Sequence, residues 1–183
     1  MNKKEKEAIQ LLKKYGVKDE KIRHCFAVAK ISRLIAEKLK KKRKKIDIDL
    51  VYSGALIHDI GYFKGATEKQ RINHSKIGAG IAKKEGFGKY SKIVLRHDLK
   101  GWVYDSLRPV SWEEKIVNYA DKRERAGVGI VGLKEREKMF LEFFGPDTKW
   151  LTKAFKELSK FEKELFKILG MNPVDLKKFV RLD

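Results

Sequence analysis

The side chains of this sequence best suited to chemistry are its four histidines and two aspartates placed among them: His24, His58, Asp59, His74, His97 and Asp121. Neutral imidazole nitrogens and ionised carboxylates are ligands for zinc, iron, manganese, cobalt and nickel, and this set needs no cysteine. Six such ligands are enough for two metals when one carboxylate bridges them. We therefore expect a divalent transition metal (Mn, Fe, Co, Ni or Zn), with one or two ions per chain.

A lone histidine is more often an exposed or hydrogen-bonded residue than a ligand, so the hypothesis depends on the ordered set. The order His, His-Asp, His, His, Asp, with the tetrapeptide His58-Asp59-Ile60-Gly61, resembles the HD superfamily of metal-dependent phosphohydrolases. The adjacent His-Asp pair names that family, and members with Ile-Gly after it are often written HDIG. The resemblance runs from about Lys21 to Arg125.

The resemblance implies a division of the six ligands between two metals. The first metal would be held by His24, His58, Asp59 and Asp121. The second would be held by His74 and His97, with Asp59 as the bridge. If His74 and His97 lie too far from the bridge, they would instead contact phosphate or protonate the leaving group as general acids. Asp59, His74 and His97 are accordingly the catalytic candidates.

Two cations about 3.5–4 Å apart lower the pKa of a shared water and stabilise the leaving oxygen of an in-line displacement. The resemblance thus implies a phosphohydrolase, either a phosphomonoesterase or a phosphodiesterase, that acts on a nucleotide or a related small phosphorylated substrate. One alternative is a di-iron HD-type oxygenase. The other is a basic nucleic-acid-binding protein with a structural metal, although such a site is usually closed by four ligands.

Substrate phosphates need cations, and five lie near the ligands in the sequence: Lys64, Arg71, Arg96, Lys122 and Arg123. Arginine suits a bidentate contact with phosphate, whereas lysine acts as a point charge. Trp102 and Tyr104 follow His97 and are candidates for stacking on a base, although such aromatic residues pack on a core as often.

The composition sets limits on class and partners. The 183 residues carry 44 Lys+Arg against 25 Asp+Glu, a net charge of +19, which favours nucleic acid, nucleotides or acidic membrane surfaces as partners but is also typical of heat-adapted proteins. The single cysteine, Cys25, and the charged first segment, Met1 to Lys14, favour a cytoplasmic protein. No apolar run approaches the roughly 18 residues of a membrane span.

Helical periodicity places the ligands on a scaffold. Asp19 is expected to cap a helix that runs to about Lys42, with His24 near its start. A second helix is expected from about residue 47 or 49 to Gly61, which would take a left-handed conformation and leave His58 and Asp59 on the last turn. Helices are also expected over 74–84 and 89–96, with an irregular segment over 62–73.

A capping box at residues 111–114 predicts a helix that carries Asp121 and runs to Arg125. The glycine-rich segment 126–132 is interpreted as a flexible connection. Residues 133–144 and 146–170 are predicted to be helical, and the apolar stripe of the second is either core or a homodimer seam. A short last helix starts at Asn172 and Pro173.

These patterns predict an all-α fold, an HD-domain helical bundle with additional C-terminal helices. We expect residues 1–183 to form a single HD-type domain, with its core over about 19–126 and the C-terminal helical extension over about 133–182.

Overall fold

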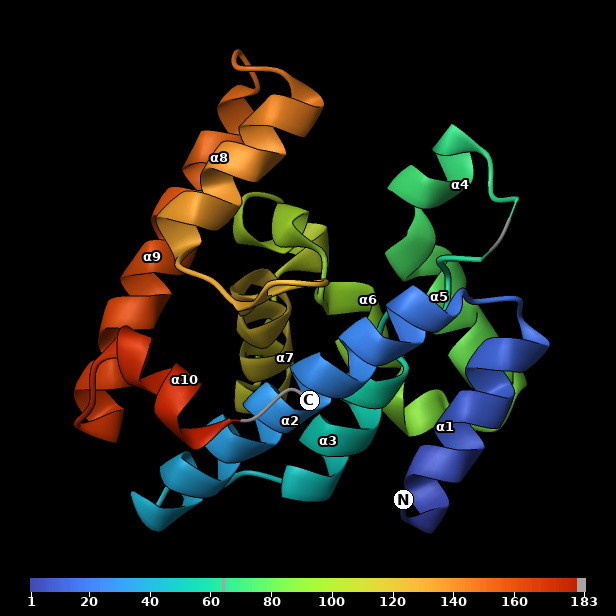
Figure 1. The fold of residues 1–183 in the computed structure, drawn as a ribbon, viewed down its shortest axis with the longest axis horizontal. Helices are drawn as coiled ribbons and strands as arrows, with labels where there is room; N and C mark the ends of the chain where they lie inside the picture. The colour runs from blue at the N-terminus through green and yellow to red at the C-terminus, as the bar shows by residue number, and fades with distance from the viewer. Residues whose placement is uncertain (64, 181–183) are drawn as a thin grey trace.

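The computed structural model describes residues 1–63 and 65–180, and it confirms the all-α fold (Figure 1). The α-helices of this described part are α1 (Lys3–Lys14), α2 (Asp19–Lys41), α3 (Ile48–Leu56), α4 (Glu68–Ile72), α5 (His74–Lys84), α6 (Ser91–Arg96), α7 (Trp112–Arg123), α8 (Leu133–Phe144), α9 (Lys149–Leu169) and α10 (Leu176–Phe179). Short 3-10 helices join them: η1 (Gly88–Tyr90), η2 (Leu99–Trp102), η3 (Asp105–Leu107) and η4 (Pro173–Asp175). The end of the expected C-terminal extension, residues 181–182, lies outside the described residues.

Helices α2, α3 and α7 pack together and form the centre of the molecule. Their apolar side chains are withdrawn from water, and Ile31 and Ile35 on α2 are 0% exposed. The expectation that Asp19 caps α2 was wrong by one residue. Lys18 is the N-cap, and Asp19 is the first helical residue, where its negative charge favours the positive end of the helix dipole.

Helix α3 ends five residues earlier than expected, at Leu56. Residues 57–61 instead form consecutive tight turns, in which the amide of Ile60 donates to the carbonyl of Ile57 at 3.0 Å. His58 and Asp59 therefore lie on a turn after the helix and not on its last turn. The apolar run continues through this segment, so periodicity alone gave no sign of the change.

Gly61 does not take the expected left-handed conformation, because it is not among the glycines with positive φ. A Cβ atom at this position would lie 2.0 Å from the carbonyl oxygen of His74. The absence of a side chain thus allows the backbone of the turn to approach the start of α5 directly.

Residues 62–73 contain one element that the sequence did not predict, the short helix α4. Thr67 caps it, and Gln70 completes the capping box. Helix α5 then packs on α6, which brings His74, the first residue of α5, close to His97, the residue that caps the end of α6. Helix α1 was also not predicted; it packs on α3 and lies on the same side of the molecule as α5 (Figure 1).

The predicted capping box of α7 is confirmed, because Ser111 accepts from the amide of Glu114 and the Glu114 side chain reaches back. The helix ends at Arg123, two residues earlier than expected. Two very short strands, β1 (Glu124–Arg125) and β2 (Gly129–Ile130), pair antiparallel, with Glu124 opposite Ile130. The glycine-rich segment 126–132, interpreted from the sequence as a flexible connection, thus contains the turn and the second strand of a small hairpin.

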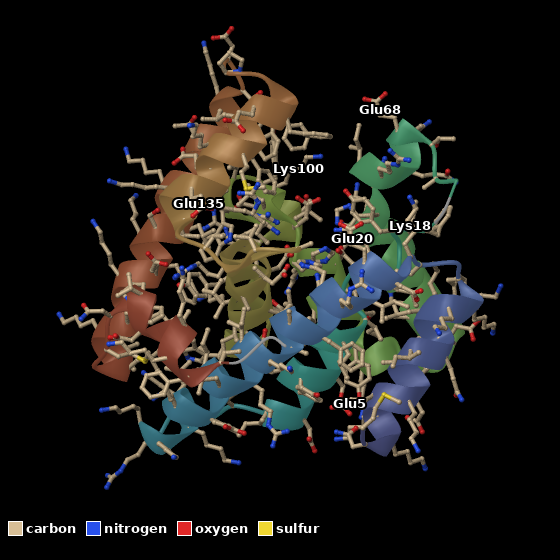
Figure 2. The ribbon with its side chains drawn as sticks, in the orientation of Figure 1. Glu5, Lys18, Glu20, Glu68, Lys100 and Glu135 are labelled. Carbon is tan, nitrogen blue, oxygen red and sulfur yellow. The ribbon has the colours of Figure 1, made fainter. Side chains whose placement is uncertain are left out.

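Helices α8 and α9 form a hairpin on the side of the molecule opposite α1 (Figure 1). The apolar stripe of α9 is core, because it packs on η2 and α2, and Leu151, Ala154 and Leu158 are 0% exposed. Figure 2 shows side chains between the α8–α9 hairpin and the helices at the centre of the molecule. Within the described residues, no helix combines the length and apolar character that crossing a membrane requires.

Candidate metal centre

The structure brings all six predicted ligands to one place from five separate segments. His24 lies in the second turn of α2, and Asp121 in the last turn of α7. The turn after α3 carries His58 and Asp59. His74 is the first residue of α5, and His97 is the C-cap of α6. Five of the six are buried, whereas the His74 side chain is 14% exposed.

The first half of the centre, which we define as His24, His58 and Asp121, gathers around one oxygen of Asp59. Nε2 of His24 lies 2.9 Å from Oδ1 of Asp121, and Nε2 of His58 lies 3.6 Å from the same oxygen. Oδ2 of Asp59 is 3.6 Å from Nε2 of His24 and 3.7 Å from Nε2 of His58. The four ligand atoms thus surround a common point.

The second half, His74 and His97, faces the other oxygen of Asp59. Oδ1 of Asp59 lies 3.2 Å from Nε2 of His97 and 3.7 Å from Nε2 of His74. The two Nε2 atoms are 3.0 Å apart. Asp59 therefore presents one carboxylate oxygen to each half, which is the arrangement that a bridging ligand requires.

Every histidine of the centre is oriented through its Nδ1 atom. His58, His74 and His97 donate from Nδ1 to the carbonyls of Ala55, Arg71 and Val94, at 2.7, 2.7 and 2.6 Å. His24 instead bonds the Glu124 carboxylate. Because these oxygens can only accept, each Nδ1 carries a proton, and each Nε2 offers a lone pair to the centre. Such outer partners commonly fix the orientation of metal-binding histidines.

These lone pairs fit a divalent cation. Nε2 of His58 is buried and has no hydrogen-bond partner among the described residues. The lone pairs of His74 and His97 face each other across 3.0 Å, which is repulsive without a cation between them. Ligand atoms about 2.1 Å from one metal lie roughly 3.0–3.4 Å from one another, close to the separations found here. The structure thus contains buried His/Asp groups able to hold a metal.

The ionisation of the ligands also favours a bound cation. Burial opposes ionisation of Asp59, but Lys21 and His58 outweigh it and hold the pKa of this carboxyl well below its usual range. Burial also lowers the pKa of His58, yet the charge of Asp59 raises it well above the ordinary value, so positive charge is favoured at this point. Burial and the neighbouring His97 lower the pKa of His74 to about 4, which keeps its lone pair available at neutral pH.

The comparison with protein families agrees with this geometry. The model of the HD domain matches residues 22–126, the segment that carries all six residues. The chain belongs to the HD domain family. The family resemblance expected from the tetrapeptide is thereby confirmed, and HD domains bind divalent metals.

Curated relatives of this HD domain protein differ in length from it. The tRNA (cytidine(56)-2'-O)-methyltransferase of Thermoplasma volcanium is 31% identical over 92% of this chain and 48% of that protein. An uncharacterised protein of Methanocaldococcus jannaschii is 32% identical over 55% of this chain and 63% of its own length. Ribonuclease Y of Pseudothermotoga lettingae is 27% identical over 74% of this chain and 26% of that protein.

The chain thus spans about half the length of the methyltransferase that it matches. No solved structure gives a significant match.

Sequence reasoning missed a lysine at the mouth of the HD site. Nζ of Lys21 donates to Oδ2 of Asp59 at 3.1 Å and lies 4.7 Å from the centre of the Tyr62 ring, which in turn contacts the His74 ring at 4.3 Å. Burial lowers the pKa of Lys21, but Asp59 and Asp121 raise it above its usual value, so the ammonium persists. Its position three residues before His24, on the same face of α2, was the available signal.

Two further missed residues support the ligands without facing the centre. Glu124 accepts from His24, and it lies one turn beyond Asp121 in the sequence. Asn118 donates to the carbonyls of Arg96 and Asp98, at 2.9 and 3.0 Å, and so holds the segment around His97 against α7.

The predicted substrate cations have different positions. Lys122 is buried beside the centre, where it bonds Asp121 and donates to the carbonyl of His97 at 3.2 Å. Arg71 is exposed on α4, one turn before His74. Arg96 is held by both carboxylate oxygens of Glu114, at 2.9 and 3.0 Å. Lys64 lies outside the described residues.

Arg123 is not brought to the HD site. Its guanidinium is buried and donates to Glu162 of α9 at 2.7 Å, to Tyr119, and to the carbonyls of Val131 and Pro173. These partners lie on the α7–α9 side of the molecule and engage four of the five N–H groups of the guanidinium, so Arg123 joins α7 to α9.

Trp102 and Tyr104, the two candidates for stacking on a base, lie in different environments. Trp102 packs on Phe161 at 5.3 Å and donates to Asn118 at 2.6 Å, so it belongs to the core rather than to a base-stacking surface. Tyr104 is 48% exposed.

Proposed function

We propose that this HD domain protein is a metal-dependent phosphohydrolase that cleaves a phosphomonoester or phosphodiester of a nucleotide or a related phosphorylated compound. The observation that carries the proposal is the position of Asp59, whose two oxygens each face a separate group of histidine Nε2 atoms at 3.2–3.7 Å. A closed structural site has no use for a second set of ligands.

Each ligand has a proposed place in this mechanism. His24, His58 and Asp121 would hold the first cation, His74 and His97 would hold the second, and Asp59 would offer one carboxylate oxygen to each. Divalent cations in such a pair supply Lewis acidity and lower the pKa of water at neutral pH. His74 is the most exposed ligand, with 14% of its side chain accessible, so the substrate reaches the centre from its side.

Lys21 and Arg71 are the proposed contacts for the substrate phosphate. The Lys21 side chain is 39% exposed and its ammonium already lies 3.1 Å from Asp59, so a phosphate oxygen that enters the centre meets a positive charge. Arg71 lies on the outer side of His74, where its exposed guanidinium can contact a more distant phosphate group. Lys122, which is buried, orients Asp121 and the backbone at His97.

The names of the relatives support a substrate that contains nucleotides. One is a ribonuclease and one is a tRNA methyltransferase, so both act on RNA. A phosphodiester of RNA or of a short oligonucleotide therefore belongs in any first panel of substrates, beside nucleoside phosphates and cyclic nucleotides.

The experiment that tests the proposal measures phosphate release and phosphodiester cleavage across that panel, with manganese, cobalt, nickel, iron, zinc or magnesium added to metal-depleted protein. Asp59→Asn is measured beside the wild type because it removes the bridging charge without changing size. Asp105→Asn is the matched control, since Asp105 is exposed on η3 and pairs with Arg108.

Metal-dependent turnover that is lost in Asp59→Asn and kept in Asp105→Asn is the expected result. Two irons per chain with oxygen consumption and no phosphoester cleavage would instead identify an oxygenase. Turnover that survives in Asp59→Asn would refute the proposed site.

A further inference from the structure

Helix α9 carries a continuous lysine face on the side opposite its buried stripe. Lysines recur at intervals of four, three, four, three and four residues, and all are exposed: Lys149, Lys153, Lys156, Lys160, Lys163 and Lys167. At 100° per residue, these positions fall within a sector about 80° wide and extend over about 27 Å. We call them the α9 lysine face.

Within the part of the chain that the structure describes, this face is largely without ion-pair partners. Among the described residues, Lys160 is the one member that forms an ion pair, with Glu157 at 2.7 Å. Glu162, also on α9, points inward to Arg123 and Tyr119. Like charges spaced three and four residues apart on a helix repel one another. A heat-adapted surface places lysines in ion-pair networks, and this face lacks such a network.

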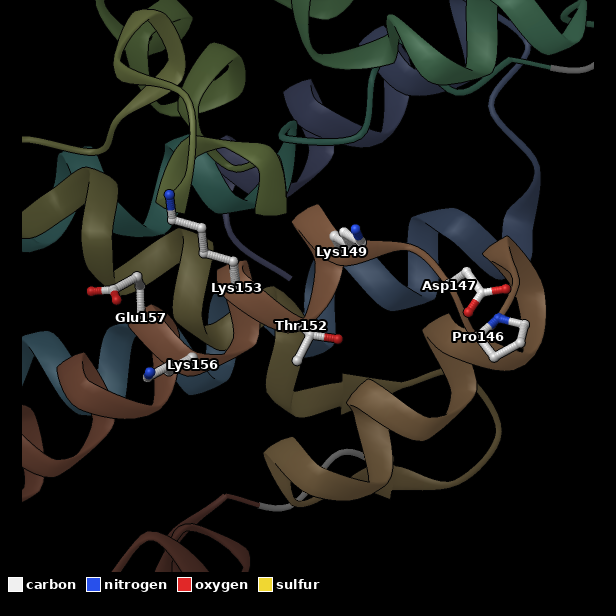
Figure 3. Close-up of a pocket in the computed structure, with 7 residues that line it drawn as sticks. All are labelled: Pro146, Asp147, Lys149, Thr152, Lys153, Lys156 and Glu157. Carbon is white, nitrogen blue, oxygen red and sulfur yellow. The ribbon is translucent and has the colours of Figure 1, made fainter.

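The N-terminal part of the face borders a surface hollow of about 600 Å³. Lys149, Lys153 and Lys156 line it, together with Thr152 and the Pro146 ring of the preceding loop (Figure 3). Two carboxylates, Asp147 and Glu157, also line it, and the second is paired with Lys160. The lysines therefore outnumber the carboxylates within the hollow.

An exposed aromatic cluster lies at the same end of the α8–α9 hairpin. The Phe143 side chain is 82% exposed, although it contacts Phe144 with ring centres 4.9 Å apart. Phe144 in turn contacts Trp150, in the first turn of α9, at 5.9 Å. An exposed ring beside a row of cations is the combination that binds unpaired nucleotides, because phosphates follow the cations and bases stack on the ring.

We infer that the α9 lysine face and the Phe143 ring form a docking surface for single-stranded RNA. The face is much longer than a mononucleotide, which fits an extended polyanion. Its apolar counterpart on α9 is buried in the core, so it is not available for insertion into lipid. This surface is separate from the metal centre, and the inference does not depend on the hydrolase proposal.

The test measures binding of the full chain to a fluorescent 20-nucleotide RNA by anisotropy between 50 and 200 mM KCl. The RNA carries 2′-O-methyl groups throughout, which removes the 2′-hydroxyl as a nucleophile. The variant Lys149→Gln, Lys153→Gln, Lys156→Gln is compared with Lys76→Gln, Lys83→Gln, Lys84→Gln, which removes the same charge from exposed positions on α5, on the opposite side of the molecule.

The α9 variant is expected to bind at least tenfold more weakly, and the slope of log K against log salt is expected to fall by about 2, because each phosphate contact on a single strand contributes roughly 0.7. The α5 variant should change affinity less than twofold. Phe143→Ala should weaken binding about fivefold or more. Val110→Ala is the control at another exposed apolar residue, and it should leave RNA binding unchanged.

Equal losses in the two lysine variants would overturn the inference, because they would show attraction by net charge alone. Binding that is unchanged by the α9 substitutions would overturn it as well. A chain that sediments with phosphatidylserine vesicles but does not bind the RNA would show that the face serves an anionic membrane. Circular dichroism spectra of all variants confirm that the substituted surface positions leave the fold intact.

Discussion

The two halves of the metal centre are built differently. The first half draws His24 and Asp121 from long packed helices, and a buried carboxylate, Glu124, orients His24. The second half consists of His74 and His97 at the ends of α5 and α6, and backbone carbonyls accept from their Nδ1 atoms. Only the second half includes a partly exposed ligand. The first half is thus part of the core, whereas the second extends from the buried His97 to the partly exposed His74.

Asp59 joins the halves, so its removal should have the largest effect. In Asp59→Ala both sites lose a ligand and both cations lose neutralising charge. We expect metal content to fall below one ion per chain and activity to fall by more than the roughly 10–100-fold that loss of an outer partner costs. Elemental analysis of dialysed protein together with turnover measurements checks this. Two ions retained per chain would show that Asp59 is not the bridge.

Substitution of one histidine from each half should separate their contributions to stability. His24→Ala leaves the buried Glu124 without its partner, so the free energy of unfolding should fall by about 1–3 kcal/mol. His74→Ala leaves a backbone carbonyl near the surface and removes the contact with the Tyr62 ring, so this free energy should fall by less, about 1 kcal/mol or below, while metal content falls from two ions to one. Urea denaturation of metal-depleted proteins measures both values. Similar losses would contradict the difference between the halves.

Gly61→Ala should disturb the second half selectively. The added Cβ would meet the carbonyl of His74 at 2.0 Å, so the start of α5 must move. Such crowding typically costs about 1–3 kcal/mol. We expect loss of the second ion and retention of the first, measured by metal titration. Gly80→Ala is the matched control, because Gly80 lies on α5 with open space around its Cα, and this variant should bind both ions.

Glu124→Gln should weaken the first half alone. The amide keeps the size of the side chain and can still accept from Nδ1 of His24, but it removes the charge that makes the imidazole a stronger ligand. Affinity for one of the two ions should fall roughly 10–100-fold, and the other should be unchanged. Competition with a metal-binding dye distinguishes this from an equal decrease at both sites, which would count against separate halves.

Lys21→Met should have the smallest effect on the centre itself. The methionine keeps the length of the side chain beside Tyr62 and removes the ammonium that faces Asp59. With a charge-assisted contact to the substrate phosphate lost, kcat/KM should fall by about tenfold, while metal content stays at two ions. Lys18→Met, at the exposed N-cap of the same helix (Figure 2), is the control.

The sequence was sufficient to identify the six ligands as one family pattern, because their order along the chain, His, His-Asp, His, His, Asp, is the order found in HD domains. It could not show the end of α3, since residues 50–60 are almost continuously apolar and a change from helix to turns leaves that pattern intact. The sequence also could not show that Lys122 lies beside the metal centre and Arg123 does not. Adjacent residues on α7 point about 100° apart, so one reaches the centre and the other reaches Glu162.

The outer partners were hidden for a related reason. Glu124 could have been found as a carboxylate one turn beyond Asp121. Nothing in its local sequence, however, distinguishes it from the other acidic residues of the chain. Asn118 acts through backbone carbonyls of the segment around His97, so the sequence carries no complementary residue that would reveal it.

Three of the four histidines donate from Nδ1 to the carbonyl three residues before them, at Ala55, Arg71 and Val94. A carbonyl is present whatever the side chain, so these three hydrogen bonds do not depend on side-chain chemistry, although Ala55 and Val94 are themselves buried in the core. Only His24 depends on the identity of another residue. Among the partners that accept from the four Nδ1 atoms, Glu124 is thus the one whose hydrogen bond a single side-chain substitution would remove, so the aim of three imidazoles is fixed by the course of the backbone and that of the fourth by one carboxylate.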